Sequence, residues 1–266
     1  MIKTRIVVGV DGSTGSTAAV RWAATEARLR KVELRVLTAY HRQQLGRGVA
    51  VGRQRPPAEQ EAGAAVHAAV AEARSVAPGL EVRGVAQSGY AVPVLLHAAE
   101  EAALLVVGCG GGGMPGMPGG SVDNQVATHA RGCVVVVRGR STADAGPVVV
   151  GVDVESPAAQ TVIGRAFEEA ALRGAALLAV TTRGDGRTPD AGQDSPLDRW
   201  RDKFPEVTAD HEVVRGNPEK VLVERSRRAQ LVVVGPRRHG FEGVLLGAVG
   251  TRLLQRAECP VLIARP

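Results

Sequence analysis

The chain has 266 residues, of which 44% are hydrophobic, 23% are charged and 3% are aromatic, and its formal net charge is +6. These proportions are typical of a folded globular protein and exclude a disordered chain. No apolar run reaches the roughly 18 residues of a membrane span, and the N-terminal run does not resemble a signal peptide. We therefore expect a cytoplasmic protein without a membrane partner.

The excess of basic residues raises the question of a nucleic-acid partner. Aromatic side chains that could stack on bases are scarce, and the arginines are spread along the whole chain. The chain also lacks a helix-turn-helix or RNP-like motif. We interpret the charge as a solvated basic surface and expect no nucleic-acid partner.

The three cysteines, Cys109, Cys133 and Cys259, have no metal-binding spacing. Because their number is odd and they form no CxxC pair, neither a disulfide framework nor a zinc site is indicated. We expect buried thiols and no metal site built from cysteine.

Short β-branched runs alternate with longer helical patterns along the first half of the chain. Such a succession predicts a parallel, doubly wound sheet of an α/β protein. The first predicted helix has Ser13, Thr14 and Ser16 at its start, and each of them is a candidate N-cap. Strands are predicted at 5–10, 33–39, 80–86, 104–107 and 133–138, and helices at 16–30, 58–76, 90–101 and 121–131.

The second half repeats the first. The segment RIVVGVD at 5–11 returns as PVVVGVD at 147–153, and LLVVG ending at Gly108 returns as LVVVG ending at Gly235. Two copies of one supersecondary pattern predict two domains of one fold. We place these domains at 1–138 and 147–266, joined by a polar linker at 139–146.

Each half ends in an apolar strand, CVVVVR in the first and CPVLIAR in the second. Such a strand exposed at a sheet edge would promote aggregation. Pairing the two edges with each other removes this hazard. We therefore predict an internal pseudo-dimer, while the sequence leaves a further homodimer and any protein partner open.

The segment GCGGGGMPGMPGGS, from Gly108 to Ser121, contains eight glycines. Glycine tolerates positive φ, so that several amides of such a loop can point at one oxyanion. A helix that begins after Ser121 adds its free amides, and ligands of doubly wound sheets bind beyond the carboxyl ends of the strands. We interpret the segment as a phosphate-binding loop, and a mobile connector is the alternative.

Two better-known phosphate motifs do not apply to this loop. The residues from Gly108 to Gly113 match G-x-G-x-x-G by letter, but the prolines that follow prevent the immediate helix of the dinucleotide fingerprint. A Walker A loop is also absent, since no Gly-Lys-Ser/Thr closes the segment. No His, Asp or Glu occurs from Leu104 to Val122, so we predict no catalytic residue and at most slow hydrolysis.

Two aspartates accompany the loop. Asp11 ends the first strand, where its carboxylate could accept hydrogen bonds from a ribose or an adenine edge, or could satisfy the amides of its own turn. Asp123 lies in the first turn of the helix after the loop. It could help to hold Mg²⁺, although its favourable interaction with the helix dipole is the simpler explanation.

The combination of IVVGVDGSTGSTAAVRWAATEA, LLVVG, a glycine-rich loop, GS and a terminal apolar strand resembles the universal stress protein (UspA) family. Both halves resemble it, as in the tandem members. The resemblance implies a flavodoxin-like, Rossmann-like domain in each half, with pairing through the last strand. It further implies binding of ATP or another adenine nucleotide, with or without Mg²⁺, and a stress-response role as a sensor or regulator.

The family's nucleotide motif, G-x2-G-x9-G-[S/T], carries over to particular residues of this chain. In the second half Pro236 removes an amide donor and Ala248 replaces the terminal Ser, so we expect ATP mainly in the first domain. The first-half loop is one residue short, with eight residues between Gly111 and Gly120. The nucleotide contacts implied for the first half are Val10, Asp11, Gly12, Ser13, Ala39, Gly108, Gly110, Gly111, Gly120, Ser121 and Val122, and those for the second half are Asp153, Gly235, Arg238 and Gly247.

Three functions are therefore in competition. The first is an adenine-nucleotide-binding stress protein. The second is a nucleotide-free scaffold that acts through protein–protein contacts. The third is a slow ATPase.

Overall fold

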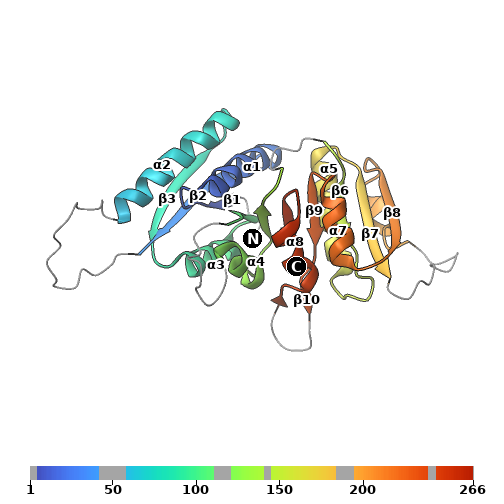
Figure 1. Cartoon of the computed structure of the whole chain (residues 1–266). Coiled ribbons are helices and arrows are strands. Elements are labelled where there is room, and N and C mark those ends of the chain that lie inside the picture. Colours follow the sequence, from blue (N-terminus) through green and yellow to red (C-terminus); the bar gives the residue numbers. More distant parts are fainter. Residues whose placement is uncertain are drawn as a thin grey trace. The chain divides into compact units, whose positions relative to one another are not determined.

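The computed structural model describes residues 5–41, 58–110, 121–140, 145–183, 195–238 and 244–265. The chain forms two compact units, Met1–Val126 and Ala127–Pro266. In each unit helices alternate with the strands of a sheet (Figure 1). None of the helices in the described ranges is long and apolar enough to cross a membrane.

The first unit contains a four-stranded parallel sheet in the order β3-β2-β1-β4. The central strand β1 pairs with β2 on one side and with β4 on the other, with Val8 opposite both Val36 and Val106. These three valines are fully buried. The elements are β1 (Arg5–Gly9), α1 (Thr14–Arg30), β2 (Glu33–Tyr40), α2 (Ala58–Val76), β3 (Val82–Ser88), α3 (Ala91–Glu101), β4 (Leu104–Gly108) and the first turns of α4 (Val122–His129).

The second unit has the strand order β5-β12-β9-β6-β7-β8. The strands β8-β7-β6-β9 repeat the order β3-β2-β1-β4 of the first unit. A six-residue helix, α6, takes the place of the 19-residue α2. The short strands β10 and β11 pair antiparallel with each other. The elements are β5 (Val134–Val137), β6 (Val148–Gly151), α5 (Ala159–Arg173), β7 (Leu177–Arg183), α6 (Asp198–Lys203), β8 (Ala209–Arg215), α7 (Pro218–Ser226), β9 (Leu231–Val234), β10 (Arg237–Arg238), β11 (Val244–Leu245), α8 (Ala248–Arg256) and β12 (Val261–Ile263).

The predicted pairing of the two terminal strands is confirmed within the second unit. Strand β5 of the first sequence copy runs antiparallel to β12 of the second, with Val135 opposite Leu262. Both side chains are fully buried. The two apolar edges therefore protect each other, as the avoidance of free edge strands requires.

The arginine that follows each terminal strand caps the last helix of the other copy. Arg138, after β5, donates to the carbonyl oxygens of Leu253 and Leu254 in α8. Arg265, after β12, donates to the carbonyl oxygens of Ala127, at 2.6 Å, and Thr128, at 3.1 Å, in α4. A cation at a helix C-terminus is favourable because the last carbonyls have no partner within the helix. Burial lowers the pKa of Arg265.

We expect Arg265→Met to lower the free energy of unfolding by about 2–4 kcal/mol, because it removes charged hydrogen bonds and leaves buried carbonyls unsatisfied. Arg256→Met, at an exposed position in the last turn of α8, serves as the control. Urea unfolding followed by circular dichroism measures both. Equal losses in the two variants would show that the cap contributes nothing.

The predicted linker at 139–146 is anchored at both of its described ends. The Arg140 amide donates to the Glu258 carbonyl at 2.9 Å, and the Gly146 carbonyl accepts from the Gln230 side chain at 2.7 Å. Gly139 has φ of 57°, and a Cβ there would lie 2.7 Å from the Glu258 Cα. The domain limits themselves stay a prediction.

Gly139→Ala should be more destabilising than Gly174→Ala. Both glycines have almost the same left-handed φ, 57° and 58°, but a Cβ at Gly174 would meet nothing within 4 Å. The conformational cost of about 1–2 kcal/mol is thus common to both, and the backbone overlap at Gly139 adds about 1–3 kcal/mol. Chemical denaturation of the two variants measures the difference, and equal values would contradict it.

Candidate functional site

The chain order of the first sheet reverses between β1 and β4, which is where doubly wound sheets bind their ligands. The turn after β1 is fixed by two hydrogen bonds. The Val10 amide donates to the Leu37 carbonyl at 2.9 Å, and the Thr38 hydroxyl donates to the Val10 carbonyl at 2.7 Å. The backbone that leads to Asp11 is therefore held against β2.

Asp11 follows β1 and is exposed to solvent. Its Oδ1 accepts from the Ser13 amide at 3.0 Å, and Ser13 in turn caps α1 by accepting from the Ser16 amide at 3.1 Å. Partial burial raises the pKa of Asp11, but the hydrogen bonds from Ser13 and Ser16 outweigh it and the pKa is lowered. Asp11 is thus an ionised hydrogen-bond acceptor at neutral pH.

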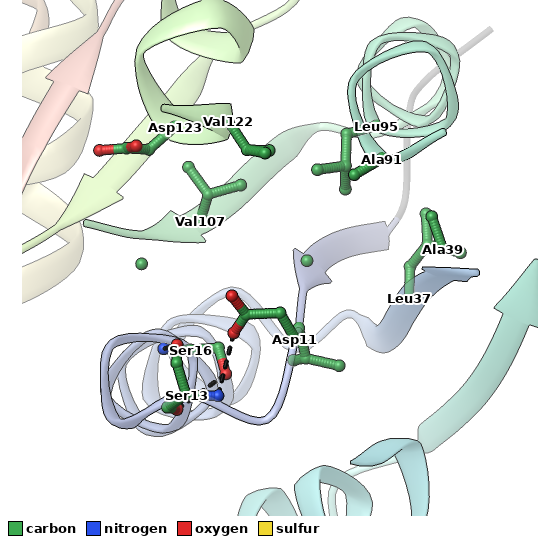
Figure 2. A pocket seen from close by; sticks show the side chains of 13 residues that line it. Asp11, Ser13, Ser16, Leu37, Ala39, Ala91, Leu95, Val107, Val122 and Asp123 are labelled. Carbon is green, nitrogen blue, oxygen red and sulfur yellow. Dashed lines mark hydrogen bonds between the residues drawn. The ribbon is translucent and has the colours of Figure 1, made fainter. Parts of the chain in front are cut away.

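A cavity of about 120 Å³ lies beside Asp11, at the carboxyl ends of β1, β2 and β4. Figure 2 shows Asp11 on one side of it and Val122 and Asp123, at the start of α4, on the other. The remaining wall is largely apolar. The cavity is lined by Gly9, Val10, Asp11, Ser13, Ser16, Leu37, Ala39, Ala91, Leu95, Val107, Gly108, Val122 and Asp123.

Gly108 allows the end of β4 to pack directly against the first turn of α1. A Cβ at this position would overlap the Gly15 carbonyl and would lie 2.8 Å from the Ser16 amide nitrogen. Two residues later, Gly110 has φ of 80°, which glycine adopts at low cost. The glycines at the start of the loop therefore have a packing role and a conformational role.

Six residues predicted for the first site line the cavity, namely Val10, Asp11, Ser13, Ala39, Gly108 and Val122. Gly12, with φ of 79°, belongs to the same turn as Asp11. Ser121 directly precedes α4, and its carbonyl accepts from the Gln125 amide at 3.0 Å. Gly111 and Gly120 lie outside the described residues, so the convergence of the loop amides stays a prediction.

Sequence reasoning missed the residues that complete the wall. Ala91 and Leu95 come from α3, and Leu37 and Val107 from the strand ends. A signal was present for the first pair, since they occupy one face of α3 at i and i+4. Their contribution to the cavity depends on how α3 packs on the sheet, which the spacing alone does not give.

The second unit has a cavity at the corresponding place, and its volume is about 660 Å³. Asp153 Oδ1 accepts from the Glu155 amide at 3.3 Å, two residues further along the chain, as Asp11 does from Ser13. Thr181, in the wall of the cavity, bonds the His211 ring nitrogen at 2.9 Å. Burial, followed by the nearby charge of Arg201, lowers the pKa of His211, so that its ring is neutral at physiological pH.

Three of the residues predicted for the second site, Asp153, Gly235 and Gly247, line this cavity. Gly247 is the N-cap of α8, and no side chain caps this helix. Arg238 lies in β10, and its side chain lies outside the described part of the chain. Pro236 also lines the cavity, without an amide proton to donate.

The first cavity combines an apolar wall with the Asp11 carboxylate and with the first residues of α4, a combination typical of small-molecule sites. Among the described residues, no three side chains of His, Cys, Asp or Glu gather in a group that could hold a metal ion.

These features define a duplicated α/β protein of the doubly wound class, with a cavity at the carboxyl ends of the strands in each unit. The universal stress protein family matches residues 3–138 and again residues 145–265. The chain therefore belongs to the universal stress protein family, in its tandem form.

A relative that matches nearly the whole chain agrees with this assignment, and one solved structure of similar length has the same fold. Universal stress protein Rv2623 of Mycobacterium tuberculosis is 34% identical, over 98% of this chain and 96% of its own length. The crystal structure of a universal stress protein from Archaeoglobus fulgidus shares the fold, with a TM-score of 0.77 at 17% identity, over 99% of this chain and 96% of that one. A shorter universal stress protein, solved in complex with cAMP, covers 51% of this chain and 96% of its own length, at 28% identity and a TM-score of 0.41.

Gly108→Ala should separate β4 from the start of α1, because the added methyl group overlaps backbone rather than a movable side chain. We expect a loss of about 2–4 kcal/mol in the free energy of unfolding. Gly110→Ala is the matched control, because nothing lies within 4 Å of its added Cβ, and it should cost about 1–2 kcal/mol. Thermal and urea unfolding measure both, and a Gly108→Ala loss no larger than the control would refute the contact.

Proposed function

We propose that this universal stress protein binds ATP or another adenine nucleotide, mainly in its first half, and acts as a cytoplasmic stress-response sensor or regulator. The observation that supports this most directly is the cavity between Asp11 and the start of α4, at the point where the strand order reverses. Several residues assigned from the family motif meet there although they are far apart in the sequence.

The walls of the first cavity suit a flat purine ring and its ribose. Ala39 and Ala91 are small, while Leu95 and Val122 add apolar surface, as is usual in sites for aromatic ligands. Asp11 stands at the mouth as an acceptor, and ribose hydroxyls are donors. In the proposed pose the base lies against the apolar wall and the ribose bonds the Asp11 carboxylate.

The phosphates would then extend toward the glycine-rich loop and the N-terminus of α4. The amides of Val122 and Asp123 belong to the first turn of that helix and have no acceptor within it. Such amides bind phosphate in many nucleotide proteins. Each charge-assisted hydrogen bond contributes about 1.5–3 kcal/mol, so a few of them suffice for a micromolar complex of roughly 8 kcal/mol.

Cavity volume and donor chemistry favour different halves. The second cavity, at about 660 Å³, is larger than the first, at about 120 Å³. However, volume measures space, whereas phosphate affinity depends on convergent donors. In the second half Pro236 lacks an amide proton, and Ala248 has no hydroxyl at the position that Ser121 has in the first half. We therefore assign the tighter site to the first half.

We expect Asp11→Ala to weaken the binding of ATP by about tenfold or more, because an ionised acceptor for the ribose is lost. Asp153→Ala, the equivalent change in the second half, should affect only a weaker second binding step. Isothermal titration of wild type and both variants with ATP measures the affinities and the number of sites. Equal effects of the two substitutions would contradict a dominant first site.

Nucleotide that copurifies with the chain separates the competing functions. Chromatography of the heat-denatured protein should release adenine nucleotide from wild type and much less from Asp11→Ala. Neither recovered nucleotide nor measurable affinity would instead support a scaffold that acts through protein partners. Phosphate release above background that Asp11→Ala abolishes would support a slow ATPase.

A further inference from the structure

Asp123 is a buried carboxylate in the wall of the first cavity. It is 6% exposed, and its Oδ1 has no hydrogen-bond partner among the described residues. Figure 2 shows it on the first turn of α4, on the opposite side of the cavity from Asp11. An unsatisfied buried carboxylate oxygen is costly, so a ligand that supplies positive charge at this point would be favoured.

The electrostatics of the cavity are unusual for a site that receives phosphates. The thirteen described residues that line it include two carboxylates, Asp11 and Asp123, and no arginine, lysine or histidine. Asp123 already places a negative charge at the helix end that would otherwise attract a phosphate. A free triphosphate would therefore meet repulsion at the amides it needs.

A divalent cation reverses this repulsion. Mg²⁺ is commonly held by one or two carboxylates together with the phosphates of a nucleotide, and it does not need a cage of protein ligands. Asp123 supplies an oxygen of the preferred kind, and the described residues contain no larger acidic or histidine cluster that would hold the ion alone. The residues present therefore fit a cation that binds jointly with the nucleotide.

We propose that Asp123 is a ligand for a divalent cation, and that it makes the first site selective for the metal complex of a nucleoside triphosphate over the free triphosphate. This inference rests on the proposed function and adds the chemical form of the ligand. Because binding free energies are linked, the cation raises the affinity for ATP by the same factor by which ATP raises the affinity for the cation.

Titration of the full chain with ATP, in MgCl₂ and then in EDTA, tests this directly. Wild type should bind ATP about tenfold or more tightly with Mg²⁺ than without it. Asp123→Asn should lose most of this difference, mainly because free ATP binds it better than it binds wild type. Asp202→Asn, at an exposed position of α6, is the control and should behave as wild type does.

Adenosine, which carries no phosphate, separates this inference from the proposed function. Its affinity should be independent of Mg²⁺ and equal in wild type and Asp123→Asn, which also shows that the variant is folded. Wild-type affinity for ATP that is unchanged by EDTA overturns the inference, as does full Mg²⁺ dependence in Asp123→Asn. If adenosine still binds in that case, the proposed nucleotide-binding function is retained. If neither ATP nor adenosine binds, both the proposed function and the inference about the cation are overturned.

A second readout detects the cation itself. Mn²⁺ in place of Mg²⁺ is detected by electron paramagnetic resonance, and the free-ion signal should fall when protein and ATP are both present. The decrease should exceed that caused by ATP alone, and Asp123→Asn should reduce the excess. A signal that depends on ATP but not on the protein would show that the phosphates alone hold the ion.

Discussion

The parallel pairing of β1 with β2 on one side and β4 on the other is the constraint on which the proposed site depends. It directs the helical connections away from each other at one point of the sheet. The carboxyl ends of these strands therefore lie at the point of the sheet where the chain order reverses. Asp11, Ala39 and Gly108 follow or end three different strands, and they share a cavity for this reason alone.

The two sequence copies preserve the backbone plan more closely than they preserve the chemistry. In the turn after the first strand of each copy, an aspartate side chain accepts a hydrogen bond from a backbone amide two residues later. The aspartate is Asp11 in one copy and Asp153 in the other. The side chains of that turn differ, since Glu155 lines the second cavity at the position that Ser13 has in the first. Conserved pairing of apolar strands thus maintains a fold whose two cavities differ in volume and in charge.

The ends of the two copies show how a duplicated sheet is stabilised. Antiparallel pairing of β5 with β12 buries both terminal runs. The arginine after each strand then satisfies carbonyl oxygens of the last helix of the opposite copy. Helix ends that are buried need such partners, because their last carbonyls cannot bond within the helix. Arg138 and Arg265 therefore cap these helices from positions just after the paired terminal strands.

The sequence by itself determined the alternation of strands and helices, the duplication and the apolar terminal strands, because these follow from local periodicity and repeated segments. It also identified Asp11 and Ser13, whose hydrogen bonds belong to a turn that is local in sequence. Only the tertiary structure placed Leu95 in the cavity wall and left a carboxylate oxygen of Asp123 buried without a partner in the described part of the chain. Burial and cavity walls arise from packing between distant segments, and residue spacing carries no information about the distances between them.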